Sequence, residues 1–378
     1  MAREFQKREI SLAGIIAGIL LFALFILLPS DLLHLTPTAQ KAIAVGLLMI
    51  VLWVTEAIPI PVTSLLPIVL FPVLGILPLT EALQPYASPV IMLFFGGFVI
   101  ALALEKYNLH RRVALNLVSR TGTSPARVIA GFMIATAFLS MWISNTSTAV
   151  IMFPIGMSII GIVEKQYGSE NPLLHRFGLA LMLGIAYAAN VGGSGTLVGT
   201  PSNAILVGLL RQMYDIRLDF AHWLIIGIPL IIIMTFLAWV TLTRIFFRLS
   251  SKPLTAVGEY VFDEIHKLGK LNKSEKRVIV VFTLTAFFWI FRAYLNKLAG
   301  TTVLSDSLIA TGAAILMFVV PNGTKKEALL GWPDATNLPW GILLLFGGGL
   351  SLAHGLATSG VIDIIGASLI QFGDMSPL

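Results

Sequence analysis

The chain has 378 residues, of which 57% are hydrophobic and only 12% are charged. Soluble domains have about 25% charged residues, so this composition excludes a water-soluble globular fold. The absence of cysteine excludes disulfides, thiolate metal sites, iron–sulfur clusters and cysteine nucleophiles. The formal net charge is +6, and in so apolar a chain the placement of the cations matters more than their sum. At roughly 20 residues per crossing, the length allows about ten membrane-spanning helices.

The first apolar run, Ser11–Pro29, contains 19 residues without a charge and follows Arg3, Lys7 and Arg8. A secretory signal peptide has a shorter apolar core and a small-residue cleavage site, which this run does not offer. We therefore expect a retained helix whose N-terminus lies in the cytoplasm.

Further uncharged or nearly uncharged runs recur along the whole chain. They lie near residues 42–54, 58–79, 88–104, 128–163, 177–210, 223–243, 278–291, 303–320 and 338–357. One topology places the main basic clusters on the cytoplasmic side: Lys106, Arg111 and Arg112; Lys165 and Arg176; Arg244, Arg248 and Lys252; and Lys267, Lys270, Lys273, Lys276 and Arg277. A helix-like stretch, Glu259–Leu268, is expected to lie along the membrane surface. These features predict an all-α polytopic protein of the cell inner (plasma) membrane.

The run at 128–163 is 36 residues long and has polar residues Ser144–Thr148 at its centre. Its first arm, 128–143, would form a helix of about 24 Å, which is shorter than a hydrocarbon core of about 30 Å. Two short arms that meet at a polar tip predict a re-entrant hairpin over 126–164. Two complete spans joined by a tight turn remain the alternative.

The run at 177–210 is interrupted in its middle. Residues 190–203 include four glycines and a proline, which do not sustain a helix. Unpaired backbone at membrane depth is tolerated only where it is buried in protein or lines a cavity. A broken helix of this kind indicates the binding site of a transporter.

The sequence contains one internal match. Phe95-Gly96-Gly97 aligns with Phe346-Gly347-Gly348 at an offset of 251 residues, within apolar segments of similar pattern. The match predicts an inverted-repeat transporter, although the motif could also recur by chance or as a helix-packing surface. At this offset, a counterpart of Asn145 would fall near position 396, past Leu378, so we expect the second repeat to be incomplete in this chain.

The two polar segments suit ion binding. A cation in the bilayer interior needs protein oxygens, whereas an anion needs N–H groups at helix N-termini and hydroxyl or amide donors. Ser144–Thr146 supplies both kinds of group, since an asparagine amide has one acceptor oxygen and two donor hydrogens. Gly192–Gly195 permits a close backbone approach, and Thr200–Asn203 restarts the helix. Neither apolar run contains Lys or Arg, so a bound anion would depend on dipoles and on co-bound cations.

These residues resemble a known family. The segments FLSMWISNTSTA (138–149), GGSGTLVGTPSN (192–203) and WGILLLFGGG (340–349) are similar to motifs of the divalent anion/sodium symporters, which carry dicarboxylates, citrate or sulfate. The resemblance implies a homodimer in which a transport domain moves against a scaffold in an elevator-like way. It implies that sodium is bound by Ser140, Ser144, Asn145 and the Gly193 carbonyl, and that substrate is bound by Ser144, Asn145, Thr146, Ser194, Thr200 and Pro201.

The same resemblance implies a division of the chain into functional parts. Residues 1–87 are expected to be mainly scaffold and dimerisation helices, and 88–222 to be first-repeat transport elements. Residues 223–336 would be scaffold helices with a cytoplasmic interfacial segment at 252–276. Residues 337–378 would begin the transport domain of the second repeat.

Several of these residues also admit a structural interpretation. Polar clusters in apolar segments often serve helix packing, and Thr200 and Pro201 could simply cap a helix. Ser140 could bond its own helix backbone. Glu56 is expected at an interfacial helix end, because Pro59 and Pro61 follow it, and His354 and Asp306 are expected to be structural partners rather than proton relays.

We therefore expect a sodium-coupled symporter of C4-dicarboxylates such as succinate, malate or fumarate. A sodium-independent dicarboxylate exchanger, a channel, and a transport-dead fragment that dimerises with a complete copy are the alternatives. An enzyme is disfavoured, because the chain has neither a phosphate-binding glycine loop followed by lysine nor a His-Glu-x-x-His motif.

Overall fold

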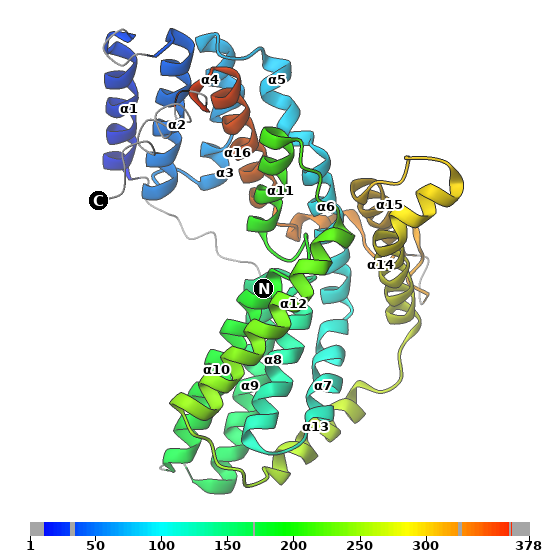
Figure 1. The fold of residues 1–378 in the computed structure, drawn as a ribbon. Coiled ribbons are helices and arrows are strands. Elements are labelled where there is room, and N and C mark those ends of the chain that lie inside the picture. The colour runs from blue at the N-terminus through cyan, green and yellow to red at the C-terminus, as the bar shows by residue number, and fades with distance from the viewer. Residues whose placement is uncertain (1–10, 31–34, 169–170, 324–326, 363, 365–378) are drawn as a thin grey trace, which may run out of the picture. The chain divides into compact units, whose positions relative to one another are not determined.

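The computed structural model describes residues 11–30, 35–168, 171–323, 327–362 and 364 (Figure 1). Seven helices of this described part are long and apolar enough to cross a bilayer, and four shorter apolar helices accompany them. This confirms the predicted all-α polytopic class. The basic residues Arg3, Lys7 and Arg8 and the end of the chain beyond 364 lie outside the described residues.

The chain forms two compact units. The first contains residues 1–91, 205–217 and 339–378, and the second contains 92–204 and 218–338. The helices of the first unit are α1 (Leu12–Leu27), α2 (Pro37–Thr55), α3 (Ile60–Thr63), α4 (Leu66–Leu74), α5 (Leu79–Leu83), the 3₁₀ helix η2 (Gln84–Ala87) and α16 (Trp340–Thr358). Two helices, α6 (Pro89–Lys106) and α11 (Pro201–Tyr214), begin in one unit and end in the other.

The remaining helices belong to the second unit. They are α7 (Leu109–Thr121), α8 (Pro125–Ser140), α9 (Asn145–Tyr167), α10 (Pro172–Gly193), α12 (Phe220–Val240), the π-helical η3 (Thr241–Phe246), α13 (Thr255–Leu268), α14 (Lys273–Ala299), α15 (Asp306–Val319) and the 3₁₀ helix η4 (Trp332–Asn337). A helix covers Glu259–Leu268 as part of α13, and its position along the membrane surface stays a prediction.

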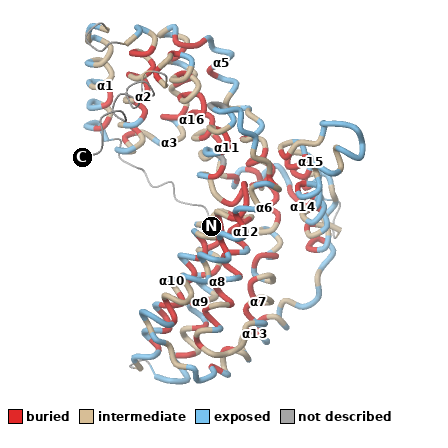
Figure 2. The backbone as a smooth tube through the Cα atoms, viewed as in Figure 1, coloured by how far each residue is buried: buried red, intermediate tan, exposed pale blue. Residues whose placement is uncertain are grey.

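Helix α8 lies at the core of the second unit and packs against α7, α9 and α10. Its side chains Phe132 and Met133 are fully buried against residues of α10 such as Leu181 and Ile185. Figure 2 shows buried residues along α8 and α10, whereas α12 is largely exposed. The apolar, exposed surface of α12 is what a lipid-facing helix requires, since lipid solvates such side chains.

The hairpin differs from the sequence expectation in the length of its second arm. Helix α8 has 16 residues, as expected for a short arm, but α9 has 23, or about 34 Å of helix. Pro154 lies inside α9 without ending it. The polar tip lies between these two helices, as the sequence predicts.

The glycines of the internal match are helix-packing positions in both copies. A Cβ at Gly96 would lie 2.4 Å from the Ala310 backbone, and one at Gly348 would lie 2.3 Å from the Ser64 carbonyl oxygen. Side chains cannot occupy such spaces, so glycine is required for these close helix contacts. Helices α6 and α16 begin at residues 89 and 340, which preserves the offset of 251.

Candidate functional site

The polar tip of the hairpin is a helix break that the local sequence specifies. Helix α8 ends at Ser140 and α9 begins at Asn145. Ser144 is the N-cap of α9: its Oγ accepts a hydrogen bond from the Ser147 N–H at 3.2 Å. Serine at this position satisfies one of the helix's unpaired donors. The cap thus fixes where the second arm of the hairpin starts.

The second break follows the glycine-rich sequence. Helix α10 ends at Gly193, and α11 begins with Pro201, a residue well suited to the first position of a helix. Asn203 ties the intervening chain together, because its Nδ2 donates to the carbonyls of Gly193 at 3.0 Å and Thr196 at 2.8 Å. The interrupted helix is therefore observed within the expected range of 177–210.

The two breaks meet in space. A Cβ at Gly193 would lie 2.2 Å from the Asn145 Oδ1 atom, and one at Gly199 would lie 2.5 Å from the Gly193 carbonyl oxygen. The Thr196 hydroxyl donates to the Met141 carbonyl, which joins the unwound segment directly to the hairpin tip. Glycine is needed here because any side chain would push the two breaks apart.

Oxygen atoms cluster where the breaks touch. The Ser140 Oγ is fully buried and lies 2.6 Å from the Ala189 carbonyl oxygen and 2.9 Å from the Asn145 Oδ1. A hydroxyl has one proton, so it can fully satisfy only one of these two acceptors. Gly193 adjoins the Asn145 side chain, and its carbonyl uses one of its two lone pairs for Asn203. Such an arrangement suits a hard cation, which takes oxygen ligands.

Donors for an anion lie on the adjacent helix end. The first N–H groups of a helix lack intrahelical acceptors, and in α9 they belong to Asn145 and Thr146. The helix dipole adds partial positive charge at this end. Thr146 is exposed, and the Asn145 amide nitrogen lies 3.4 Å from the Asn190 Oδ1. A carboxylate at this helix end would meet donors next to the oxygen cluster.

The remaining predicted substrate residues lie in the second break with backbone roles. The Ser194 carbonyl accepts from the Trp223 indole N–H at 2.9 Å, and the Thr200 carbonyl accepts from the Asn203 N–H at 3.2 Å. Pro201 is the first residue of α11. These contacts fit the capping interpretation of Thr200 and Pro201, and their role in binding substrate stays a prediction. The alternative that Ser140 bonds its own helix is wrong, since its partners are Ala189 and Asn145.

Sequence reasoning gave no role at the site to Asn190 or Trp142, and it gave Asn203 only a place in the segment that restarts the helix. The two asparagines mark the ends of the glycine-rich segment, so their positions were the available signal. Trp142 lies between Ser140 and Ser144, and its ring is stacked on Trp289 at a centroid distance of 6.4 Å. It also meets Phe282 edge-on at 4.7 Å. The tip is therefore held from outside by an aromatic wall on α14.

An ionic network anchors this aromatic wall. Asp306 accepts from the Phe220 N–H at 2.8 Å, and its carbonyl accepts from the Trp289 indole at 3.0 Å. Arg292 bridges Asp306 at 3.3 Å and Asp219 at 2.6 Å. These contacts match the expectation that Asp306 is a structural partner.

Two other polar residues also behave as expected in the first unit. His354 lies 3.8 Å from the Glu81 carboxylate as a structural partner. Glu56 is the left-handed cap that ends α2, with φ of 46°. Glu56 therefore marks the helix end that the following prolines predict.

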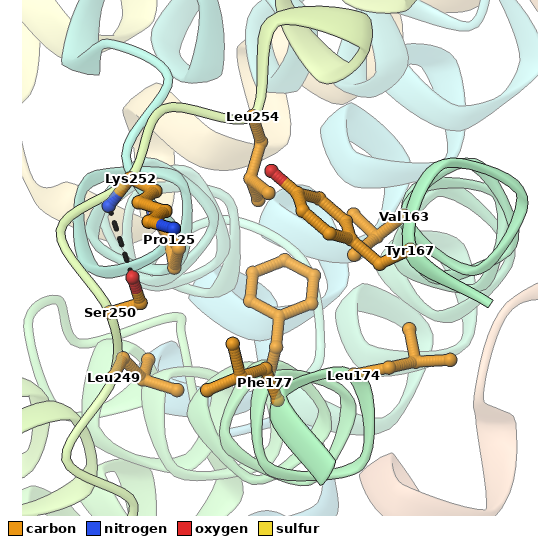
Figure 3. Close-up of a pocket in the computed structure, with 10 residues that line it drawn as sticks. Pro125, Val163, Tyr167, Leu174, Phe177, Leu249, Ser250, Lys252 and Leu254 are labelled. Atoms are coloured by element: carbon orange, nitrogen blue, oxygen red, sulfur yellow. Dashed lines mark hydrogen bonds between the residues drawn. The ribbon is translucent and has the colours of Figure 1, made fainter. Parts of the chain in front are cut away.

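A separate apolar hollow lies at the other end of the hairpin. Figure 3 shows the Phe177 ring pointing into the space enclosed by Tyr167, Leu249 and Leu254. Its volume is only about 40 Å³, whereas sites for small molecules have about 300–1,000 Å³. These side chains close the base of the helix bundle and do not form a solute site.

Comparison with known proteins agrees with the motifs. The model of the sodium:sulfate symporter transmembrane region matches residues 9–377. The chain is 41% identical over 374 residues to the sodium-dependent dicarboxylate transporter SdcS of Staphylococcus saprophyticus, covering 97% of this chain and 72% of the relative. It is 39% identical to SdcS of Staphylococcus aureus strain USA300, covering 97% and 71%. The family consists of transporters rather than enzymes. The chain belongs to this family, the sodium:sulfate symporters, which are also called divalent anion/sodium symporters.

Proposed function

We propose that the protein is a sodium-coupled symporter of divalent anions, with C4-dicarboxylates such as succinate, malate and fumarate as its substrates. The observation that carries this proposal is the contact between the two helix breaks. It brings the oxygens of Ser140, Ala189 and Asn145 together next to the N-terminus of α9. The names of the Staphylococcus relatives, which are sodium-dependent dicarboxylate transporters, support the same substrate class.

Sodium would bind among the oxygens of Ser140, Asn145 and the Gly193 carbonyl. The Ser140 hydroxyl proton would go to the Ala189 carbonyl, which leaves a Ser140 lone pair facing the Asn145 Oδ1 at 2.9 Å. A cation between these oxygens would relieve the repulsion of two unshared lone pairs. Ser144 would act chiefly by capping α9, because its hydroxyl already donates to the Ser147 Oγ at 3.0 Å.

The substrate carboxylate would bind at the start of α9. The N–H groups of Asn145 and Thr146 and the Asn145 amide would donate to it. Ser194, Thr200 and Pro201 would line the side formed by the second break. Because Asn145 would contact both ions, sodium binding orients the amide that receives the anion. A residue that contacts both ions explains why sodium and substrate binding are coupled. Without sodium, the anion would interact only with the dipoles of the helix and the amide groups.

Alternating access would follow an elevator-like movement of transport elements against a scaffold, within a homodimer in the plasma membrane. Residues 88–222 and 337–378 would move, while 1–87 and 223–336 would form the scaffold. The inverted-repeat arrangement is supported by the match of Phe95–Gly97 with Phe346–Gly348 and by the starts of α6 and α16, which lie 251 residues apart. The N-terminus would lie in the cytoplasm, as the basic clusters favour.

The test is succinate uptake by the full-length protein in sealed vesicles. An inward sodium gradient should drive accumulation, and an equal potassium gradient should not. Counterflow of labelled succinate in sodium-free vesicles tests the alternative, a sodium-independent dicarboxylate exchanger. Uptake that is equal in both salts, or robust counterflow without sodium, would refute sodium-coupled symport.

A further inference from the structure

A second cavity lies outside the candidate transport site, between helices α7, α9 and α13. Its volume is about 320 Å³, which is within the range of small-molecule sites. The residues that line it are His110, Arg111, Ile151, Pro154, Ile155, Ser158 and Tyr260. Nothing in the proposed sodium or dicarboxylate chemistry uses these side chains.

One wall of the cavity is apolar. Ile151, Ile155 and Ser158 are spaced by four and three residues, so they lie on one face of α9, and Pro154 adjoins them. The Ser158 hydroxyl donates to the Pro154 carbonyl at 2.9 Å. The Pro154 ring adds apolar surface to this face. The wall therefore suits a hydrocarbon chain.

The opposite wall is positively charged. Of the seven lining residues, Arg111 is the one with a formal charge, since burial lowers the pKa of His110 and keeps its imidazole neutral at pH 7. Arg111 pairs with Glu264, which also accepts from Lys267 at 2.8 Å. Glu264 is thus shared by two cations, and Asp263 also interacts electrostatically with Lys267. Tyr260 lines the same cavity, and its side chain carries a hydroxyl that can donate.

The neighbouring arginine provides a contrast. Arg112 is 15% exposed and donates to the carbonyls of Leu268 and Gly269 at 2.9 and 2.8 Å. Arg111 is 45% exposed, while its partner Glu264 is 10% exposed. A guanidinium has five donor hydrogens, so Arg111 can hold Glu264 and still present donors to an anion in the cavity.

We propose that this cavity binds an anionic phospholipid, with its phosphate on Arg111 and Tyr260 and an acyl chain along Ile151 and Ile155. The assignment rests on the topology in the proposed function, which places α7 and α13 at the cytoplasmic face, where anionic lipids and basic residues attract each other. Helix α13 carries Phe262, whose exposed ring suits insertion at the lipid boundary. An apolar wall beside a half-exposed guanidinium with donors to spare suits a lipid phosphate and its acyl chain.

The test measures lipid binding by the purified full chain in detergent, without sodium or dicarboxylate, so that its failure and a failure of transport are separate results. Native mass spectrometry would compare phosphatidylglycerol, phosphatidylcholine and inorganic phosphate. We expect retention of phosphatidylglycerol over phosphatidylcholine, and a loss of its affinity of about tenfold in Arg111→Gln. Arg120→Gln, the same charge change at an exposed position of α7, is the matched control and should bind as the wild type does.

Tyr260→Phe provides a second variant that keeps the Arg111–Glu264 pair and should still weaken phosphatidylglycerol binding severalfold. Equal lipid binding by Arg111→Gln and Arg120→Gln, or by Tyr260→Phe and wild type, would overturn the site. Equal retention of both lipids would overturn its preference for an anionic headgroup. Inorganic phosphate could instead bind without displacing lipid, and Arg111→Gln could weaken its binding to the same extent. That result would show a site for soluble anions and would overturn the lipid assignment.

Discussion

Replacement of Gly193 by alanine perturbs the contact between the two helix breaks at one atom. The added Cβ would lie 2.2 Å from the Asn145 Oδ1 and 3.0 Å from its Cγ. Contacts below 3.0 Å do not occur for real Cβ atoms, so Asn145 must move by about 1 Å or the helices must separate. Overpacking of this kind costs about 1–3 kcal/mol. Alanine also recovers up to about 1 kcal/mol of helix propensity in α10, but this gain is the same with and without sodium and does not change the cost to sodium binding.

The displaced group is the proposed sodium ligand, so the cost should be seen in sodium affinity. If binding requires the native position of Asn145, 1–3 kcal/mol corresponds to about a 5- to 150-fold rise in the sodium concentration for half-maximal succinate binding. The assay is a sodium titration of succinate binding by the purified full-length protein at constant ionic strength. The melting temperature, measured in parallel, separates a local effect from general unfolding.

Gly161→Ala is the matched control. It lies in α9 of the same hairpin, and a Cβ there would meet no atom within 4 Å. We expect it to leave sodium affinity unchanged and to stabilise the helix slightly. A sodium titration of Gly193→Ala that superimposes on those of Gly161→Ala and wild type would refute the reasoning, because the contact would then have no role in sodium binding.

Two further variants test the parts that hold the site, and a third tests the ion pairs of α13. Asn203→Ala removes two buried hydrogen bonds, to the carbonyls of Gly193 and Thr196, and only the Thr196 carbonyl keeps another donor, the Gly199 N–H. The variant should therefore cost about 1–3 kcal/mol in a denaturation experiment, and an unchanged unfolding midpoint would contradict this. Trp289→Leu removes the aromatic ring that packs against the hairpin tip and should weaken sodium binding severalfold. Phe291→Leu, at an exposed position of the same helix, should leave sodium binding unchanged. Equal sodium affinities of the two variants would contradict a role of the aromatic wall in sodium binding. Glu264→Gln tests the pH dependence of stability. A hydrogen bond from Lys267 is the main cause that lowers the pKa of Glu264 in the folded protein. This carboxylate therefore stabilises the fold above its unfolded pKa of about 4.3, and the contribution is lost as the pH falls through the lower folded pKa. The melting temperature should therefore fall less between pH 6 and pH 3 in the variant than in the wild type, and parallel curves would refute the assignment.

The sequence predicted both helix breaks because their signals are local. Ser144 is a strong N-cap within an apolar run, and the glycines around Gly193 followed by Pro201 interrupt a helix wherever they occur. The end of α2 at Glu56 was equally readable from the prolines after it. Local chemistry therefore located the two helix breaks along the chain, and the family motif gave the proposed roles of their residues.

Other features depend on packing between distant segments and had no local signal. The stacking of Trp142 on Trp289 joins residues 147 positions apart in the chain, and nothing near either residue specifies the other. Asn203 resembles an ordinary helix-start residue, yet its amide crosses back to Gly193. The long second arm of the hairpin was not predicted because only the first arm, 128–143, was measured against the bilayer, whereas α9 continues to Tyr167 and packs against α8 and α10.

The most direct test of the central claim is the affinity of the full-length protein for succinate in sodium chloride and in potassium chloride of equal concentration. We predict tighter binding in sodium for the wild type and for Asn116→Ala, whose amide bonds only its own helix at the Arg112 carbonyl among the described residues. Asn145→Ala should lose this difference between the salts while keeping its melting temperature. Equal affinity in the two salts for the wild type, or a sodium effect that survives in Asn145→Ala, would contradict the account.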